Sequence, residues 1–243
     1  MDDVALLATQ MRGLFRWDEG GRIAGVNSPD GNSGPLVYLA GNADGVVHAV
    51  RSDVAAGLAG TIDEVCGRAR GWDEGLVQAV RELVGGGADQ ERHLVWELAS
   101  GVRAAAPGEA VLVVSGTEAG DALMERLARE VPEEVRAAGF LGPGDFWEPW
   151  VVALPGGDIA ATAFAARIAG GSAEVGVYTF AGFRGRGFAA AVTAAWAAHT
   201  ELADRALFYS ALEKSARSAS SGCAAHAAVT AAANPRPRNP AKV

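Results

Sequence analysis

Hydrophobic residues recur along this chain with two spacings, one typical of helices and one typical of strands. Spacings of three and four positions predict helices over Val4–Phe15 and Trp72–Val84. A third helix is predicted directly after Thr117, which can cap it. Alternating or short apolar runs, bounded by turn residues, predict strands. These strands are expected at Arg22–Val26, Pro35–Ala40, Val46–Val50, Ala110–Ser115, Trp150–Leu154 and Ile159–Ile168. The mixture predicts an α/β (α+β) protein.

Other segments give weaker patterns. The first three strands are expected to form an antiparallel meander, and Asp53 is expected to cap a helix running through Val65. Glu91–Val102 is predicted to be a helix, and Pro132–Ala138 a short one that begins with proline. Ala224–Ala233 is also predicted to be helical, and no strand pair is expected after Tyr209.

The stretch Glu174–Trp196 combines a strand, a glycine-rich turn and a helix. Val175 and Val177 alternate within a β-prone run, and an Ala/Val-rich segment follows the turn Arg184-Gly185-Arg186-Gly187. The first N–H groups of a helix have no internal partner, and glycines let an anion approach them. Two arginines add donors suited to phosphate oxygens. The stretch therefore predicts a site for a diphosphate-bearing ligand.

Three nucleotide-binding motifs compete for this turn. Residues 185–190 fit the dinucleotide pattern G-x-G-x-x-A, but Asp204 precedes the next strand and Ser210 follows it. The carboxylate that would bind the ribose is therefore missing. No Lys-Ser or Lys-Thr follows the glycines, which excludes a P-loop. Acyl-coenzyme A binding is the third interpretation.

Arg184-x-x-Gly187-x-Ala189 matches the R/Q-x-x-G-x-G/A motif of the GNAT N-acetyltransferases, and the order of predicted elements from residue 108 to about 210 resembles that family. The resemblance implies a mixed central sheet flanked by helices. It also implies acetyl-CoA as cosubstrate and no metal, with the pantetheine along one strand and the pyrophosphate on the turn. The residues implied to bind it are Val177, Tyr178, Thr179, Arg184, Gly185, Arg186, Gly187, Phe188 and Ala189.

Acetyl transfer requires a neutral amine, so a carboxylate near the thioester could accept the proton that a primary amine carries at neutral pH. Glu174 lies near where some members of the family carry such a base; the alternative is a solvated Glu at a strand start. The family's usual tyrosine acid is missing, which leaves Tyr209 as a substitute. Two functions stay open: an N-acetyltransferase, or a catalytically weak coenzyme A-binding module.

Composition narrows the partners and the location. A net charge of −8 argues against nucleic-acid binding, and the acceptor is expected to be a small-molecule or peptide amine. Cys66 and Cys223 match no metal spacing, which favours a reduced, cytoplasmic setting. No signal peptide or membrane span is predicted. Homodimer formation is left open.

A boundary is expected near Ala106-Pro107-Gly108. Residues 1–105 are interpreted as an accessory α+β domain, loosely similar to the front part of some two-part bacterial GNAT proteins through the turn Asn27-x-Pro29-x-Gly31. Residues 108–243 are interpreted as the acetyltransferase domain. From about residue 221 its tail is atypical, and the Pro/Arg/Asn composition at its end predicts a disordered or extended segment.

Overall fold

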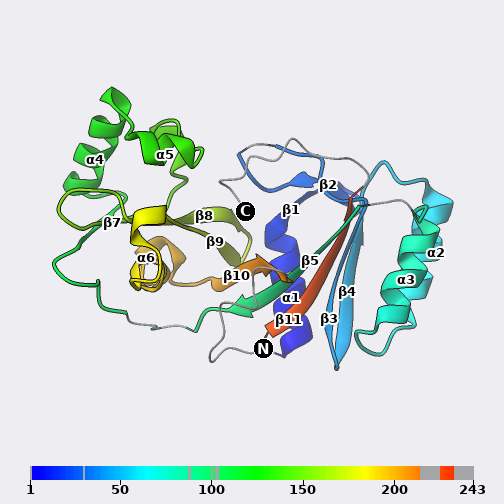
Figure 1. Ribbon diagram of the computed structural model, residues 1–243. Helices are drawn as coiled ribbons and strands as arrows, with labels where there is room; N and C mark the ends of the chain where they lie inside the picture. Colours follow the sequence, from blue (N-terminus) through cyan, green and yellow to red (C-terminus); the bar gives the residue numbers. More distant parts are fainter. Residues whose placement is uncertain are drawn as a thin grey trace. The chain divides into compact units, whose positions relative to one another are not determined.

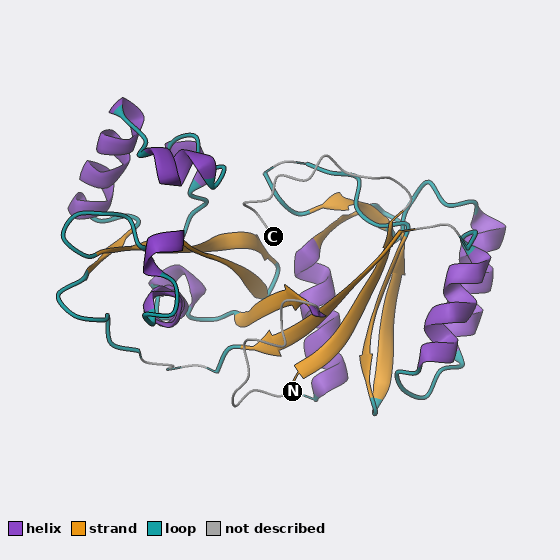
Figure 2. Cartoon of the chain, viewed as in Figure 1, coloured by secondary structure: helices purple, strands orange, loops and turns teal. Residues whose placement is uncertain are grey.

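A computed structural model describes residues 2–29, 31–86, 89–99, 101 and 104–213, and the backbone of 225–232 (Figure 1). Contacts divide the described chain into two compact units that interleave along the sequence. Unit 1 holds residues 2–97, 167–172, 208–213 and 225–232, and unit 2 holds Leu98–Ala166 and Ala173–Leu207. Both units combine strands with helices, which confirms the predicted α/β class (Figure 2).

The main sheet of unit 1 has the strand order β4-β3-β11-β5-β10, and its described pairings are antiparallel. Its registers include Leu39 opposite His48 and Trp96 opposite Tyr209. A separate two-stranded sheet pairs β1 with β2. The strands are β1 (Phe15–Trp17), β2 (Ile23–Val26), β3 (Val37–Asn42), β4 (Gly45–Val50), β5 (Asp89–Glu97), β10 (Ala206–Leu212) and β11 (Ala225–Ala232).

Helices pack on both faces of this sheet at β3 and β4. Tyr38 donates to the buried Gln10 of α1 (Asp3–Leu14), whereas the next residue, Leu39, lies in the aliphatic core under α2 (Ala56–Gly67) and α3 (Glu74–Leu83). Neighbouring residues of a strand point to opposite faces, so α1 covers one face and α2 and α3 cover the other. Asp2 and Asp73 cap α1 and α3 by accepting main-chain N–H groups.

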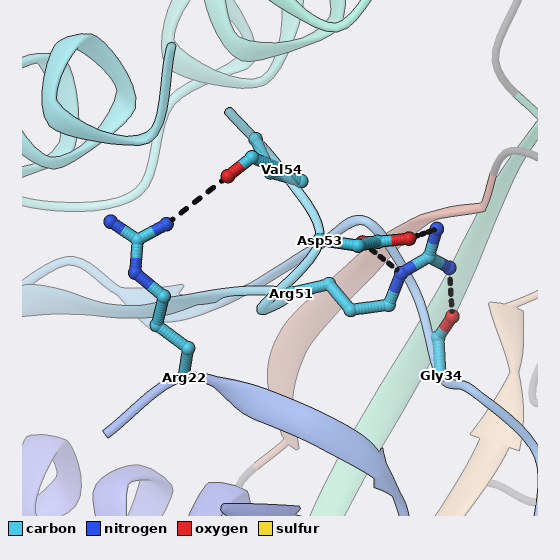
Figure 3. A network of polar contacts seen from close by, with 5 residues as sticks. All are labelled: Arg22, Gly34, Arg51, Asp53 and Val54. Atoms are coloured by element: carbon cyan, nitrogen blue, oxygen red, sulfur yellow. Dashed lines mark hydrogen bonds and ion pairs between the residues drawn. The ribbon is translucent and has the colours of Figure 1, made fainter. Parts of the chain in front are cut away.

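Asp53 does not cap α2, contrary to the prediction. The helix begins at Ala56 with Ala55 as N-cap, and Asp53 instead forms a two-bonded ion pair with Arg51 (2.7 and 3.0 Å). The hydrogen bond from Arg51 lowers the pKa of the Asp53 carboxyl. Figure 3 shows Arg51 also donating to the Gly34 carbonyl, while Arg22 donates to Val54. The Asp53 carboxylate therefore holds Arg51 in place at the connection between β4 and α2.

Three further predictions for unit 1 were wrong. The segment expected to be a helix at Glu91–Val102 forms strand β5, because it pairs with β10 on one side and with β11 on the other. The segment Ala224–Ala233, also expected to be helical, contains β11, so a strand does follow Tyr209. The meander holds only for the β3–β4 hairpin, since β2 pairs with β1. The rest of the predicted tail lies outside the described residues.

The sheet of unit 2 has the order β9-β8-β7-β6. The β8–β7 and β7–β6 pairs are antiparallel, with Val152 opposite both Thr162 and Val113. The strands predicted at Ala110–Ser115, Trp150–Leu154 and Ile159–Ile168 are confirmed. The elements are β6 (Val111–Val114), α4 (Glu118–Arg129), α5 (Glu133–Ala137), β7 (Trp150–Leu154), β8 (Ala161–Ala169), β9 (Ser172–Thr179) and α6 (Phe188–Ala197), with short 3₁₀ helices η1 (Pro143–Asp145), η2 (Ala181–Phe183) and η3 (Thr200–Leu202).

An aromatic core fills one face of the unit 2 sheet. Phe140 is fully buried and contacts the rings of Phe146, Phe164, Tyr178 and Phe180, with centroids 5.0–6.1 Å apart. Leucines and valines of α4 and α5 complete this core. Tyr178 and Phe180 stand at the end of β9, so the strand that leads into the glycine turn is anchored by ring packing. Thr117 caps α4, as predicted.

The domain boundary near residue 106 stays a prediction, and so does the accessory role of residues 1–105. The two units defined by contacts exchange segments along the chain, and strands β8, β9 and β10 each have residues in both units.

Candidate functional site

The glycine turn lies between strand β9 and helix α6, as the sequence predicted. After β9 ends at Thr179, η2 turns the chain, and Gly185 and Gly187 both have positive φ angles, 70° and 85°. Residues with a Cβ rarely adopt such angles. Gly187 is the N-cap of α6, and no side chain caps the helix. The backbone of the turn therefore depends on its glycines.

Six successive main-chain N–H groups of this turn, from Gly185 to Ala190, have no acceptor in the described part of the chain. Phe183 and Arg184 donate to Phe180 and Ala181 (2.9 and 3.5 Å), and Ala191 donates to Gly187 (3.2 Å). Between them, no hydrogen bond to a described residue is formed by the six main-chain N–H groups from Gly185 to Ala190. Free donors at a helix N-terminus attract anions, because the helix dipole adds partial positive charge there.

Both arginines of the turn are exposed but held in place. Arg184 Nε donates to the Thr179 carbonyl at 3.2 Å, which folds the side chain back toward the end of β9. The guanidinium carbon of Arg186 lies 5.4 Å from the ring centre of Phe183 and 5.1 Å from that of Phe188. These two rings meet edge to face at 5.8 Å. Cation–π contacts of this kind hold a charge in position without neutralising it.

Phe183 was missed by the sequence analysis, although an aromatic residue three positions before Arg186 and another two positions after it were a visible signal. Pro107 was also missed: a Cβ on residue 187 would meet its Cγ at 3.4 Å. Gly185 differs, because nothing lies within 4 Å of the place where its Cβ would be. Space is therefore open at Gly185 and limited at Gly187.

The structure brings together Arg184, Gly185, Arg186, Gly187, Phe188 and Ala189 in this single turn. Phe188 is only 1% exposed and anchors the helix, so its main chain rather than its side chain is offered to a ligand. Val177, Tyr178 and Thr179 are half-buried residues at the end of β9. Their pairing with a pantetheine arm stays a prediction.

Glu174 is the third residue of β9 and is only 8% exposed. The alternative of a solvated glutamate at a strand start is therefore wrong. A carboxylate loses hydration when it is buried, so such a group is retained where it makes polar contacts or carries out chemistry. Glu174 makes a polar or electrostatic interaction within the protein.

Tyr209 lies in unit 1, whereas Glu174 lies in unit 2. The ring of Tyr209 stacks on the ring of Trp96, which lies directly opposite on β5. The ring centroids are 5.5 Å apart, and the angle between the ring planes is 28°. Burial raises the pKa of the Tyr209 phenol, because the phenolate would lose hydration. The side chain is thus kept in the protonated form that a proton donor needs.

The described residues contain no group of three or more side chains that could hold a metal ion. Cys66 is a buried free thiol of α2, and burial, together with the nearby Asp63 carboxylate, raises its pKa to about 11. Cys223 lies outside the described residues. Within the same described residues, no helix combines the length and the apolar character needed to cross a membrane.

Neither a family model nor a curated protein sequence matched this chain. Among solved structures, a GCN5-related N-acetyltransferase from Kribbella flavida is 15% identical over 97% of each chain, with a TM-score of 0.45. A GCN5-related N-acetyltransferase-like protein from Streptococcus suis is 14% identical over 93% of this chain and 98% of its own, with a TM-score of 0.43.

A third similar structure, a GCN5-related N-acetyltransferase from Sphaerobacter thermophilus, is 17% identical over 84% of this chain and 78% of its own, with a TM-score of 0.38. At these scores the likenesses are distant. The solved structures similar to this chain therefore include N-acetyltransferases of the GCN5-related family, the family whose motif the residues Arg184 to Ala189 resemble.

Proposed function

We propose that this protein is an N-acetyltransferase that binds acetyl-CoA through the turn from Arg184 to Ala189 and transfers the acetyl group to an amine. One observation carries the proposal: the six N–H groups from Gly185 to Ala190 have no acceptor among the described residues and lie beside two exposed arginines. A pyrophosphate presents many acceptor oxygens to such a cradle.

The two arginines suit different parts of this task. Arg184 uses Nε for the Thr179 carbonyl at 3.2 Å, and we propose that its outer nitrogens meet the phosphates. Arg186, which lies over the rings of both Phe183 and Phe188, supplies a fixed positive charge at the turn. Val177–Thr179 would receive the pantetheine arm as an added strand, through main-chain hydrogen bonds.

The chemistry proposed for this chain is proton transfer around a thioester. The amine nitrogen forms a bond to the acetyl carbon, the carbon–sulfur bond breaks, and coenzyme A leaves as a thiol. Glu174 accepts the proton that the amine loses, directly or through water. Tyr209, whose pKa is raised by burial, supplies a proton to the departing sulfur. The acceptor is a small-molecule or peptide amine.

A second candidate is a coenzyme A-binding module with weak or no catalysis. The burial of Glu174, which is 8% exposed, favours it, because an amine must reach the base. Binding to the turn is common to both candidates, and only turnover separates them.

Binding is tested by calorimetric titration of acetyl-CoA into wild type and Gly185→Ala, with Gly182→Ala as control. Gly185 has φ 70° and open space around it, whereas Gly182 has equally open space and no positive φ. Alanine at 185 costs about 1–2 kcal/mol at such an angle, so the dissociation constant should rise about tenfold. Gly182→Ala should change it less than twofold.

Pyrophosphate should compete with acetyl-CoA for the turn, and NAD serves as the nucleotide control. Binding of NAD in place of acetyl-CoA would favour the dinucleotide interpretation instead. Absence of any heat or thermal shift with acetyl-CoA would refute the proposal, as would equal affinities of the two alanine variants. A cytoplasmic location and a homodimer stay predictions.

A further inference from the structure

The end of helix α1 and the end of strand β8 are joined through one asparagine of unit 1. Asn27 Nδ2 donates to the carbonyl oxygens of Gly13 and Ile168, at 2.9 and 3.1 Å. The main-chain N–H of Asn27 donates to Leu14 at 2.8 Å. The last carbonyls of a helix have no partner within it, so these contacts satisfy α1 while tying it to residue 168. The amide therefore uses both hydrogens to connect two segments far apart in the sequence.

Ser172 makes a second connection between the same two segments. Its Oγ donates to the Thr9 carbonyl at 3.2 Å, with the Ala169 carbonyl 3.4 Å away, and the residue is only 2% exposed. The contact is close because residue 13 has no side chain: a Cβ there would overlap the Ser172 hydroxyl oxygen. Gly13 is also buried. A glycine inside a helix usually lowers the stability of that helix. At Gly13 the missing side chain allows α1 to approach Ser172 closely.

These contacts hold the end of β8, through Asn27, and the start of β9, through Ser172. Ser172 is the first residue of β9, and Glu174 is the third. Side chains alternate along a strand, so the two project from the same face, and both are buried, at 2% and 8% exposure. A displacement of the strand at residue 172 would therefore be carried to the carboxylate two positions later. Catalytic groups need positions held to within a fraction of an ångström.

We propose that Asn27, Gly13 and Ser172 form a clamp that positions Glu174 for proton transfer. The inference rests on the proposed function, in which Glu174 is the base. These three are positioning residues, since none of them is assigned a contact with acetyl-CoA or the amine. The clamp gives residues of the N-terminal segment a part in catalysis, and it explains why the turn Ile168–Ser172 belongs to unit 1.

The first test compares Gly13→Ala with the double variant Gly13→Ala/Ser172→Ala. The single variant places a methyl group on the Ser172 hydroxyl, whereas the double variant removes that oxygen and leaves the Ser172 Cβ at 3.4 Å, an ordinary contact. We expect kcat to fall about tenfold in the single variant, because a small displacement of a catalytic group lowers the rate strongly. In the double variant kcat should recover at least threefold. The dissociation constant for acetyl-CoA should stay within twofold throughout.

Two controls separate positioning from loss of stability. Ile62 is fully buried in the aliphatic core of unit 1 under α2 and α3. It is changed to Val, or to Ala if needed, until the melting temperature falls as far as in Gly13→Ala. That variant should keep the wild-type kcat. Ser172→Ala alone is the milder change if Gly13→Ala does not fold; it removes the hydroxyl contacts to the Thr9 and Ala169 carbonyls and should lower kcat about threefold.

A readout without catalysis keeps the clamp testable on its own. The ¹³C carboxyl resonance of Glu174, assigned by its loss in Glu174→Gln, should shift in Gly13→Ala and return toward the wild-type position in the double variant. An unmoved resonance, or a kcat loss equal to that of the Ile62 control, would overturn the clamp. If wild type binds acetyl-CoA but turns over no amine, the proposed transferase fails, and the resonance alone decides the positioning.

Discussion

Gly13 and Gly185 both lie where a helix and a strand meet, but their surroundings are opposite. At Gly13 the carbonyl accepts a hydrogen bond from Asn27, and a Cβ would overlap the Ser172 hydroxyl. At Gly185 no atom lies within 4 Å of a Cβ position, and the N–H has no acceptor among the described residues. One glycine allows two parts of the protein to pack, while the other leaves main-chain donors open.

The comparison teaches how the same residue type can serve the fold in one place and a ligand in another. Where polar groups are already bonded to each other, a substitution should change stability or the position of neighbouring groups. Where donors are left without partners beside exposed charge, a substitution should change binding, and it should lower the free energy of unfolding by no more than the strain of the new residue at its backbone angle. Binding and chemistry should thus separate experimentally.

The largest effect is expected at Glu174, which lies on the strand held by the Gly13 contacts. Glu174→Gln should lower kcat by about 100-fold or more, because a general base contributes about 10²–10⁴-fold. The dissociation constant for acetyl-CoA should change less than twofold, since the turn is untouched. Steady-state thiol release over a panel of amines measures the first quantity and calorimetry the second. Glu201→Gln, at an exposed position, is the control. Equal, measurable turnover in both variants would show that Glu174 is not the base, whereas a wild type that turns over no amine would favour the non-catalytic module.

A smaller effect concerns the buried thiol of Cys66, which lies in the aliphatic core of unit 1. Burial raises its pKa from 9.0 to about 11, so the folded protein keeps the proton after the unfolded chain loses it. Its contribution to stability is full below pH 9 and is lost as the pH rises through about 11. The loss should amount to about 1–3 kcal/mol.

Urea unfolding at pH 8 and at pH 10.5 checks this prediction. The free energy of unfolding should fall more steeply with pH in wild type than in Cys66→Ala, which lacks the thiol but keeps the other titrating groups. Parallel slopes for the two proteins would show that the thiol is not protected by burial.

The smallest effect is expected at Thr162, a buried polar residue whose hydroxyl, unlike the polar groups around Gly13, has no hydrogen-bond partner among the described residues. Thr162 is fully buried on β8. Thr162→Val has nearly the same shape and should raise the free energy of unfolding by about 1 kcal/mol. The control is Ser115→Ala, since the Ser115 hydroxyl accepts the Trp150 N–H at 3.0 Å; that change should lower stability by about 1–2 kcal/mol. A destabilised Thr162→Val would mean that the hydroxyl has a partner after all.

Much of the fold could be predicted from local pattern. The helices α1 and α3, the β3–β4 hairpin and the strands β6, β7 and β8 all form close to where the spacing of apolar residues placed them. The turn from Arg184 to Ala189 also follows from local chemistry, because its glycines adopt positive φ angles and its helix begins at once. Each of these elements is decided by residues close together in the chain.

Strands β5 and β11 could not be predicted in this way. The sequence of β11, Ala225–Ala232, is rich in alanine and favours a helix by itself, yet the segment pairs with β3 and β5 on its two sides. In β5 the neighbouring residues Val95 and Trp96, which are β-branched and aromatic, were a visible strand signal that a helical interpretation overlooked. Pairing partners distant in sequence override weak local preference.

By itself the sequence determined the conformation and the charge of the turn from Arg184 to Ala189, because Gly185 and Gly187 adopt backbone angles that other residues rarely adopt and the arginines carry charge in any context. Only the tertiary structure decided that Glu174 is buried, that Tyr209 stacks on Trp96, and that Asn27 holds the end of β8 while Ser172 holds the start of β9. Burial and long-range hydrogen bonds depend on which distant segments meet, and no local spacing of residues encodes that.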